Sequence, residues 1–254
     1  MHLIILTGAS RGLGLAMAKG LVASGTTLLT LARRPADALA TTARATGCDL
    51  EQWPVDLGDP LPVAARLQAW LRDWPSRHAG AEPASTTLIH NAARLADPAA
   101  VGESDPAQLS AALRVSLEAP VVLTSAFLAA TGRWTGPRKV LNISSGLGRW
   151  AMAGAASYCA AKAGLDHFSR AVALEEAARP NGARIVSLAP GVIATDMQVQ
   201  LRSADAAKFS ERQRFVDMHA QGGLDSPESA AAKVLAFLAR PDFGSAVVAD
   251  VREA

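Results

Sequence analysis

The chain has 254 residues, of which 50% are hydrophobic, and its formal net charge is +2. This length suits one large α/β domain or two small ones, with enough apolar residues for a core without disulfides or metals. The near balance of charges argues against a nucleic-acid or membrane-surface role that depends on bulk charge. Cys48 and Cys159 have no metal-ligand spacing, so we expect free thiols in a reducing compartment, the cytoplasm.

The apolar start of the chain, MHLIILTG, is too short for the apolar core of a signal peptide and has no basic leader. By inspection, no apolar run approaches the ~20 residues that a membrane span needs. We therefore expect neither a membrane nor a nucleic-acid partner.

Short apolar runs alternate with helical patterns along the chain. Six strands are predicted, at 3–7, 26–32, within LEQWPVD (50–56), at 86–90, at 139–144 and at 183–189. The longest helices are predicted at 107–130 and 156–178. Strands that are apolar on both faces and separated by helices indicate a parallel sheet covered by helices on both sides.

We find no linker that divides the chain, so we expect a single domain over 1–254. The segment 196–223 is more polar than its surroundings and interrupts the alternation of strands and helices. We interpret it as a helical lid over a substrate site; a surface insertion is the alternative.

The stretch TGASRGLG, residues 7–14, follows the first strand and opens a helix. Gly8, Gly12 and Gly14 have the spacing of a dinucleotide-binding turn, in which glycine lets the backbone approach a pyrophosphate at a helix N-terminus. GASRG also matches the nucleophile elbow of a hydrolase. A hydrolase places that elbow deep inside a preformed sheet, with an acid and a histidine following in order, whereas this one follows the first strand.

Arginines replace the acidic residue that NAD-binding folds carry at the end of the second strand. LARRP supplies Arg33 and Arg34, with no acid until Asp37, and Arg11 lies inside the glycine turn. Guanidinium groups suit a 2′-phosphate, so we predict NADP(H) as the cofactor. Solvated loop arginines are the alternative interpretation.

Tyr158, in YCAAK, is the only tyrosine of the chain, and Lys162 lies one helical turn later on the same face. A nearby ammonium group lowers the pKa of a phenol, which is about 10 when free. A fall to about 7 needs about 4 kcal/mol, which the lysine and an oxidised nicotinamide ring can supply in a partly dry cleft. Tyr158 is then a usable general acid or base. Ser145 ends the fifth strand, where open α/β sheets bind ligands.

Together these residues resemble the classical short-chain dehydrogenase/reductase family over nearly the whole chain. The matching stretches are TGASRGLG, VDL (55–57), HNAA (90–93), NISS (142–145), YCAAK (158–162) and APGVIATDM (189–197). The resemblance implies a Rossmann-type, doubly wound parallel sheet of about seven strands in the order 3-2-1-4-5-6-7.

The resemblance also implies residue roles. Ser145 would hold the carbonyl oxygen, Tyr158 would donate its proton, and Lys162 would bind the nicotinamide ribose and depress the pKa of the tyrosine. Besides Tyr158 and Lys162, the residues implied to contact the cofactor are Gly8, Ser10, Arg11, Gly12, Leu13, Gly14, Arg33, Arg34, Asp56, Leu57, Asn91, Ala92, Ala93, Pro190, Gly191, Val192, Ile193 and Thr195.

The chain departs from the family at three positions. Ser116 stands where the family usually has an asparagine that helps to hold a water in the proton relay. A serine can bind water with one polar group fewer, so we include Ser116 in the catalytic set as a weaker part of that relay. Ala93 replaces a glycine and is expected to tighten the nicotinamide pocket. His90 has a catalytic interpretation, but we favour a hydrogen-bonded residue at a strand end.

Within the family, ALEE (173–176), APGVIATDMQ and FGSAVVADV (243–251) are similar to the sepiapterin reductase branch. Asp250 falls where that branch anchors a pterin, although a structural cap at the C-terminus explains it as well. Bacterial reductases of this branch that act on aromatic diketones such as benzil are at least as close a model.

The predicted substrate pocket is apolar and partly aromatic, which favours a flat carbonyl compound. With Ser145 and Asp250, its residues are Leu147, Trp150, Met152, Val192, Met197 and Gln198. Trp150 has an alternative role in packing at a subunit boundary. The family commonly pairs through its two long helices, so we expect a homodimer or a tetramer.

The sequence thus predicts an NADPH-dependent carbonyl reductase. One alternative is a 3-oxoacyl reductase, although Lys208, Arg212 and Arg214 in the lid do not establish a docking site for a carrier protein. The other is a catalytically silent sensor of NADP(H), which Ser116 and Ala93 would favour and which has no need of the Ser145, Tyr158 and Lys162 set.

Overall fold

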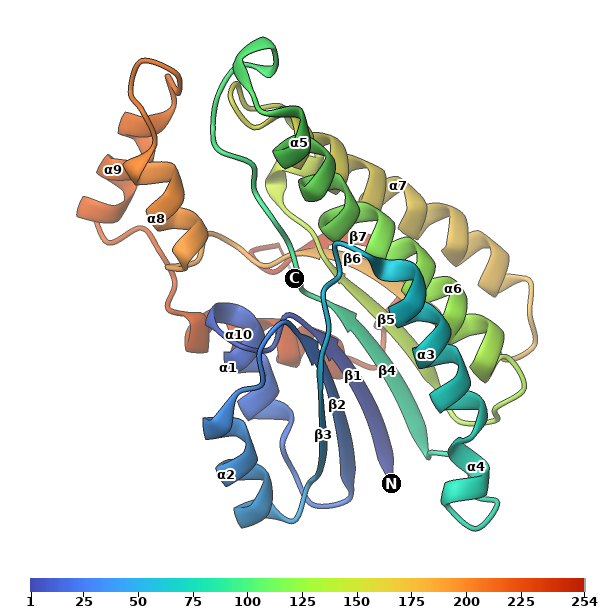
Figure 1. Ribbon diagram of the computed structural model, residues 1–254. Helices are drawn as coiled ribbons and strands as arrows, with labels where there is room; N and C mark the ends of the chain where they lie inside the picture. The colour runs from blue at the N-terminus through green and yellow to red at the C-terminus, as the bar shows by residue number, and fades with distance from the viewer. Residues whose placement is uncertain (254) are drawn as a thin grey trace.

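A parallel β-sheet forms the centre of the fold, with helices packed on both faces (Figure 1). The computed structural model describes residues 1–253. Over this range the sheet has seven strands in the order β3-β2-β1-β4-β5-β6-β7, as predicted, and all neighbouring strands are parallel. The strands are β1 His2–Thr7, β2 Thr26–Ala32, β3 Asp49–Pro54, β4 Ser85–His90, β5 Arg138–Ile143, β6 Arg184–Ala189 and β7 Val248–Asp250.

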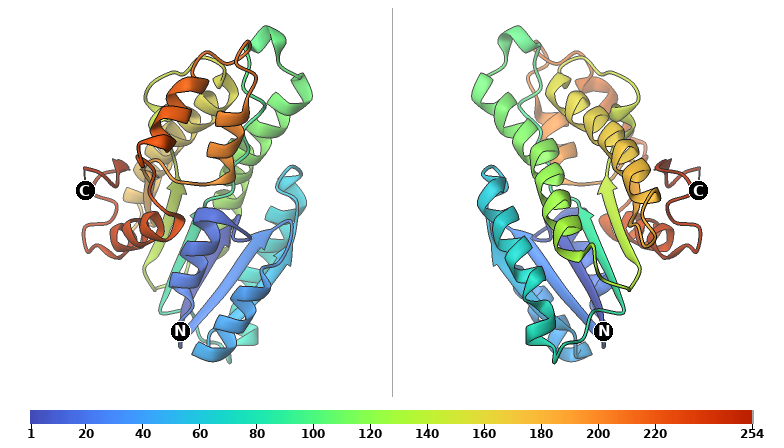
Figure 2. Two further views of the ribbon diagram at one scale, coloured as in Figure 1. Left: turned by 90° about the vertical axis from the view of Figure 1, so that its left-hand side faces the viewer. Right: turned by 90° about the vertical axis from the view of Figure 1, so that its right-hand side faces the viewer.

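The helices form two layers, which the side views of Figure 2 separate. One layer contains α1 Gly12–Leu21, α2 Asp37–Thr46 and α10 Pro227–Ala239. The other contains α3 Pro60–Arg72, α5 Pro106–Leu113, α6 Ala119–Thr131 and α7 Ala156–Ala177, with the short α4, Trp74–Arg77, after α3. Both long helices predicted from the sequence are present.

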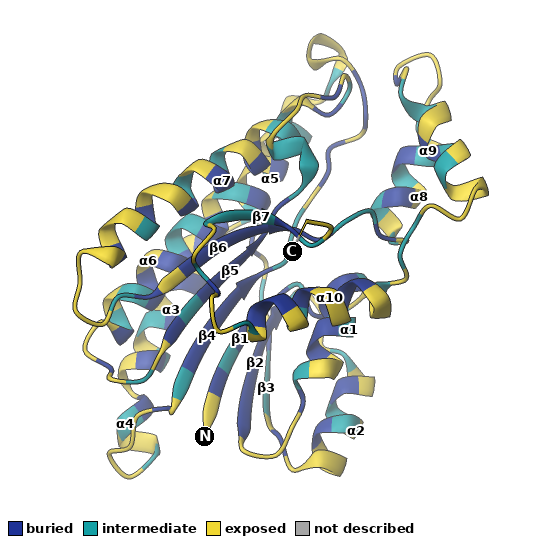
Figure 3. Cartoon of the chain, turned by 180° about the vertical axis from the view of Figure 1, so that it is seen from behind, coloured by how far each residue is buried: buried dark blue, intermediate teal, exposed yellow. Residues whose placement is uncertain are grey.

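Burial of both sheet faces explains why the strands are continuous apolar runs. In β2, Leu28 belongs to the same buried cluster as Met17 of α1, whereas Leu29 belongs to the cluster of Phe127 of α6. All four side chains are fully buried, and Figure 3 shows the dark-blue strands between helices that are exposed on their outer sides. Each such side chain stabilises the fold by about 1.5–3 kcal/mol, so the two-sided apolar pattern favours this layered arrangement.

A continuous helix over Pro106–Thr131 joins α5 and α6 and is long and apolar enough to cross a membrane, by length and composition alone. This corrects the expectation that no apolar segment approaches that length. In the fold, Leu123 and Phe127 of this helix are fully buried in the cluster that includes α3. Its middle, η2 (Arg114–Glu118), is a π-helical turn, which turns Ser116 into the interior.

The segment predicted as a lid forms two helices that stand over the carboxyl ends of the strands, in orange at the upper left of Figure 1. They are α8, Asp196–Ser203, and α9, Arg212–Ala220. The segment leaves and rejoins the fold at one point, because Ile193 and Asp225 form an isolated β-bridge. Phe209, in the connection between the two helices, stacks on Phe215 of α9 with ring centres 5.9 Å apart, and both belong to a buried cluster that includes Leu201 of α8.

Candidate functional site

The carboxyl ends of the strands open into a large cleft of about 1460 Å³ beneath α8 and α9. Open α/β sheets bind ligands at this edge because the strands end there together. The glycine-turn half of the cleft is lined by the β1–α1 turn and by the ends of β2, β3 and β4. The other half is named the insertion half, after the segment 196–223 that contains α8 and α9. It is lined by these two helices and by the residues around Ser145 and Tyr158.

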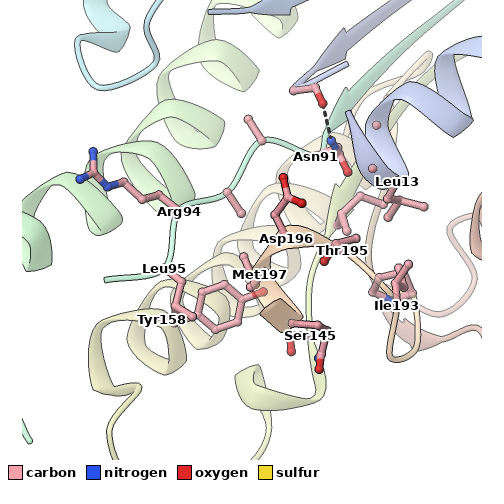
Figure 4. Close-up of a pocket in the computed structure, with 18 of the residues that line it drawn as sticks. Leu13, Asn91, Arg94, Leu95, Ser145, Tyr158, Ile193, Thr195, Asp196 and Met197 are labelled. Carbon is pink, nitrogen blue, oxygen red and sulfur yellow. Dashed lines mark hydrogen bonds between the residues drawn. The ribbon is translucent and has the colours of Figure 1, made fainter. Parts of the chain in front are cut away.

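Close backbone packing shapes the glycine-turn half. Gly8 has a φ of +73°, and a Cβ placed on Gly14 would lie 2.1 Å from the Gly8 carbonyl oxygen. The Asn91 Nδ2 donates to the carbonyl oxygens of Thr7 and Gly8, at 3.1 Å each (Figure 4). The N-terminus of α1 therefore faces the cleft with its free N–H groups, which suits the pyrophosphate of a dinucleotide.

Arginine side chains stand at the rim of this half. Arg33, at the end of β2, lines the cleft, as does Asp56 after β3. Arg11 forms an ion pair with Asp196 of α8, and both side chains are about two-thirds exposed. Arg33 is therefore free for a 2′-phosphate, whereas Arg11 must exchange its carboxylate partner to reach one.

Tyr158 and Lys162 are buried on one face of α7, as their spacing predicted. The Lys162 Nζ donates to the Ile143 carbonyl oxygen at 2.6 Å and lies 5.5 Å from the centre of the Tyr158 ring. The Ser145 side chain lies close enough to Tyr158 to lower the pKa of its phenol, and the Ser145 Oγ accepts from the Leu147 N–H at 3.2 Å. Two hydroxyl groups thus face one point of the cleft, with an ammonium group behind them.

The pKa values of this pair differ from the sequence-based expectation. Burial raises the pKa of Tyr158 to about 12, although the hydrogen bond from Ser145 lowers it. Burial also lowers the pKa of Lys162 to about 8, although Asp166 raises it. In the protein alone, loss of hydration of the phenolate outweighs the lysine, so the expected fall of the Tyr158 pKa toward 7 does not occur. Tyr158 is therefore protonated at neutral pH, the form that donates a proton.

Ser116 is fully buried in η2, and its hydroxyl is committed to the main chain. The Ser116 Oγ accepts from the Arg94 N–H at 3.0 Å and donates to the Arg94 carbonyl oxygen at 3.2 Å. A serine hydroxyl has a single proton to donate, so this contact uses it. Within residues 1–253, Ser116 is not one of the residues that line the cleft. The structure thus does not support its predicted place in the catalytic set.

His90 is buried at the end of β4, with its Nε2 3.0 Å from the Thr124 Oγ1. Burial, together with the charge of Lys162, lowers the pKa of His90 to about 3. A neutral, hydrogen-bonded histidine at a strand end is the interpretation that the sequence favoured over a catalytic one.

The insertion half is apolar around Tyr158. One buried cluster contains Leu95, Met152, Tyr158, Leu201, Phe209 and Phe215, with Ala93, Leu147 and Met197 packed against it. In Figure 4, the Tyr158 ring lies beside Leu95 and Met197, near Ser145. Trp150 is 54% exposed, and its ring lies so close to Gly146 that a Cβ there would be 2.4 Å from the Trp150 Cζ2. An apolar chamber lined by flat surfaces therefore adjoins the two hydroxyl groups.

A family model described as short chain dehydrogenase matches residues 2–206. The chain belongs to the short-chain dehydrogenase/reductase family. It is 32% identical to a benzil reductase ((S)-benzoin forming) of Bacillus cereus, over 100% of both chains. It is 31% identical to the sepiapterin reductase of Rattus norvegicus, over 97% of this chain and 94% of that protein. An NADP-bound structure from Agrobacterium tumefaciens superposes with a TM-score of 0.77 at 26% identity, covering 98% of this chain and 94% of that one.

Membership of the short-chain dehydrogenase/reductase family makes the protein an oxidoreductase of the branch that includes benzil and sepiapterin reductases. The structure brings the predicted site residues together in the cleft, apart from Arg34, Ser116 and Asp250. Arg34 follows Arg33 at the exposed end of β2, outside the described lining.

Asp250 is 2% exposed, and two arginines bind its carboxylate. The Arg252 Nη2 lies 2.6 Å and the Arg149 Nη1 3.6 Å from its Oδ2, and hydrogen bonding to Arg252 holds the pKa of Asp250 below its usual range. This placement fits the structural cap at the C-terminus and not the predicted contact with a substrate.

Several lining residues were not anticipated from the sequence. They include Arg94, Leu95, Arg202, Phe215, Met218 and Arg252. Arg94 and Leu95 follow the HNAA stretch directly, so their position after β4 was the available signal. Arg252 reaches the cleft only because β7 pairs with β6 and carries the C-terminus to this edge. Figure 4 shows the Arg94 side chain pointing away from Tyr158.

Proposed function

We propose that this protein is an NADP(H)-dependent reductase of ketones or aldehydes with flat, aromatic groups. One observation carries the proposal. The only tyrosine of the chain is buried between an apolar chamber and the glycine-turn half of the cleft, beside Ser145 and one turn from Lys162.

Each residue of this set has a distinct role in the proposed reduction. When bound, a nicotinamide cofactor would supply the hydride that reduces the carbonyl carbon. Ser145 donates a hydrogen bond to the carbonyl oxygen, and Tyr158 gives its proton to that oxygen as negative charge develops there. The high pKa of Tyr158 keeps the donor form populated at neutral pH. Lys162, fixed by the Ile143 carbonyl, carries positive charge next to the phenolate that the transfer leaves.

The proposal of NADP(H) as the cofactor depends on the arginine side chains at the rim of the glycine-turn half. Arg33 lines the cleft with no side-chain partner among the described residues, and no acidic residue follows β2 until Asp37. Binding of the 2′-phosphate by Arg33 and Arg11 competes with the Arg11–Asp196 ion pair. That pair is exposed, so its loss costs little.

The substrate class follows from the insertion half. Its apolar lining suits aromatic rings, and Asp250, already bound by Arg149 and Arg252, is not free to anchor a pterin. The full-length similarity to a benzil reductase supports an aromatic diketone over a pterin as the preferred substrate class.

We further propose a cytoplasmic homodimer that pairs through α5–α6 and α7, with α8 and α9 as a substrate lid. Leu174, on the outer face of α7, is 77% exposed, and Leu113, at the end of α5, is 37% exposed. Exposed leucines on adjacent helices provide an apolar surface that a second copy can cover.

The test is NADPH oxidation with benzil, sepiapterin and a 3-oxoester as substrates, comparing the wild type with Tyr158→Phe. We expect turnover of benzil by the wild type and a fall of at least about a thousandfold in the variant, with NADPH affinity unchanged, because the substitution removes one hydroxyl and keeps the ring. Equal rates in the two proteins would overturn the role of Tyr158. Tight NADPH binding without turnover of any carbonyl would support the sensor alternative instead.

A further inference from the structure

Asp166 is a buried carboxylate on the catalytic face of α7. It is 2% exposed and lies one helical turn after Lys162, which itself lies one turn after Tyr158. Residues four positions apart share a helix face, so the three side chains form one row. A buried charge is costly unless it is paired or hydrogen-bonded, and the proposed reduction does not by itself account for this one.

One oxygen of Asp166 fixes the turn that carries Ser145. The Asp166 Oδ1 accepts hydrogen bonds from the Ser144 Oγ at 2.5 Å and from the Ser187 Oγ at 2.6 Å. Ser144 directly precedes Ser145, and its N–H donates to the Leu188 carbonyl oxygen at 2.8 Å. The end of β5 is therefore held on both sides, by α7 and by β6.

The other oxygen of Asp166 accepts no hydrogen bond from the described residues. Its cationic neighbour is the Arg149 Nε at 4.0 Å, but Arg149 is shared with Asp250 at 3.6 Å. A Cβ on Gly148 would lie 2.8 Å from the Asp166 Oδ2 and 3.0 Å from the Lys162 carbonyl oxygen. The turn after Ser145 therefore packs directly on the Lys162–Asp166 segment of α7.

Asp166 is also the source of negative charge next to Lys162. The other titratable groups close to this segment are Tyr158 on the same helix, His90 at the end of β4 and Arg149 after the short helix η3, Gly146–Gly148. Tyr158 and His90 are neutral at neutral pH, because their pKa values are about 12 and about 3, and Arg149 is positive. Burial lowers the pKa of Lys162 to about 8, and Asp166 opposes that fall.

We infer that Asp166 is a positioning residue of the reduction site, which holds Ser145 in place through Ser144 and keeps Lys162 charged at working pH. The contacts that carry this inference are independent of the substrate, while its meaning for catalysis rests on the proposed function. Asp166 acts through its two neighbours and is outside the described lining of the cleft.

The test measures the pKa of Lys162 directly, without substrate or cofactor. The chain has five lysines, so labelling them with ¹³C at Cε gives five resonances, of which Lys162→Arg identifies one. Asp166→Asn keeps the shape and a hydrogen-bond acceptor but removes the charge. We expect it to lower the pKa of Lys162 by about one unit from its wild-type value, the size typical of a nearby opposite charge.

Two further variants control for the surrounding network. Asp250→Asn removes the other carboxylate that binds Arg149 and leaves Lys162 nearly unchanged. Arg149→Gln removes a positive charge and shifts the pKa of Lys162 upward, a sign opposite to Asp166→Asn. If Asp166→Asn does not fold, Asp166→Ser removes the same charge with a smaller side chain and should lower the pKa of Lys162 in the same direction. An unchanged Lys162 pKa in Asp166→Asn, or equal shifts in Asp166→Asn and Asp250→Asn, would overturn the inference.

A kinetic readout links the same charge to catalysis. The rate of reduction should fall as pH rises through the pKa of Lys162, and in Asp166→Asn this alkaline limb should move to lower pH by the shift seen in the lysine resonance. A lower rate with an unmoved limb would leave only a structural role and would overturn the inference. If no carbonyl is reduced by the wild type, the proposed function fails, while the lysine titration still tests the placement of charge by Asp166.

Discussion

The two halves of the cleft are built in different ways. In the glycine-turn half, main-chain atoms pack directly against each other. Gly14 lies against the Gly8 carbonyl, and the Asn91 side chain donates hydrogen bonds to two main-chain oxygens. In the insertion half, side chains from α8 and α9 pack on Tyr158 around an apolar chamber. A backbone-built surface tolerates few substitutions, whereas a surface of side chains can change its ligand one residue at a time. If the proposed function holds, the first half preserves the binding of a cofactor and the second sets the choice of substrate.

The largest effect is expected from Gly14→Ala, which disrupts the close main-chain packing of the glycine-turn half. The new Cβ would lie 2.1 Å from the Gly8 oxygen and 2.4 Å from the Asn91 Nδ2, so α1 must move away from the turn. We expect loss of NADPH binding and destabilisation by about 3 kcal/mol, measured by cofactor titration and urea unfolding. The control is Gly102→Ala, where a Cβ meets no atom within 4 Å among the described residues. Normal NADPH binding by Gly14→Ala would contradict this account of the turn.

Lys162→Met tests the point where the two halves meet. We expect kcat to fall at least about a hundredfold, because the charge next to Tyr158 is lost. Burial lowers the pKa of Lys162 from 10.5 to about 8, so removal of the charge favours the folded state at pH 7 by about 3 kcal/mol. Methionine also loses the hydrogen bond to the Ile143 carbonyl oxygen, which costs about 1 kcal/mol, so the free energy of unfolding should rise by roughly 2 kcal/mol.

The wild type offers a matching pH dependence. Between about pH 8 and 10.5 the unfolded chain holds the Lys162 proton and the folded chain does not, so this residue makes stability increase with pH. Urea unfolding at several pH values checks both statements. Two results together would contradict them: a Lys162→Met variant less stable than the wild type at pH 7, and a wild type whose free energy of unfolding does not increase between about pH 8 and 10.5.

Arg33→Ala sharpens the assignment of the cofactor. A charge-assisted contact to a 2′-phosphate is worth about 2 kcal/mol, so we expect the Kd of NADPH to rise about thirtyfold and that of NADH to change less than about twofold. Arg34→Ala is the matched control, because the neighbouring Arg34 is outside the described lining of the cleft. If Arg33→Ala raises the Kd of NADPH and that of NADH by the same factor, Arg33 does not bind the 2′-phosphate.

The smallest effect is expected from Trp150→Leu in the insertion half. The exposed indole forms part of the chamber wall, so its loss should raise the KM for benzil about fivefold, close to 1 kcal/mol, without changing NADPH affinity. Sedimentation of the same variant tests the alternative that Trp150 packs at a subunit boundary. A change in oligomeric state with an unchanged KM would favour that alternative.

The same contrast explains which features the sequence could predict. All six strands predicted from the sequence end within two residues of their observed ends, and β7 completes the predicted order, because two-sided burial gives each strand a clear apolar pattern. Gly8, Gly14, Tyr158 and Lys162 were predictable because their roles depend on spacing along one element.

Contacts between distant segments carried no comparable signal. The commitment of the Ser116 hydroxyl to Arg94 depends on a π-helical turn that composition does not reveal. Arg252 is a local partner of Asp250, two residues further along the chain, but Arg149 comes from a distant segment that only the fold brings to it. The pKa of Tyr158 likewise depends on burial, which a neighbouring lysine in the sequence does not report.

The solitary tyrosine at the centre of the cleft also makes the protein unusually easy to label. Cells supplied with fluorotyrosine would place fluorine at position 158 and nowhere else in the chain, without any substitution. Because the ring is 9% exposed and packs against Leu95 and Met152, its ¹⁹F resonance would report the state of the apolar chamber. One signal from each protein molecule could then follow ligand entry into the cleft in the purified protein.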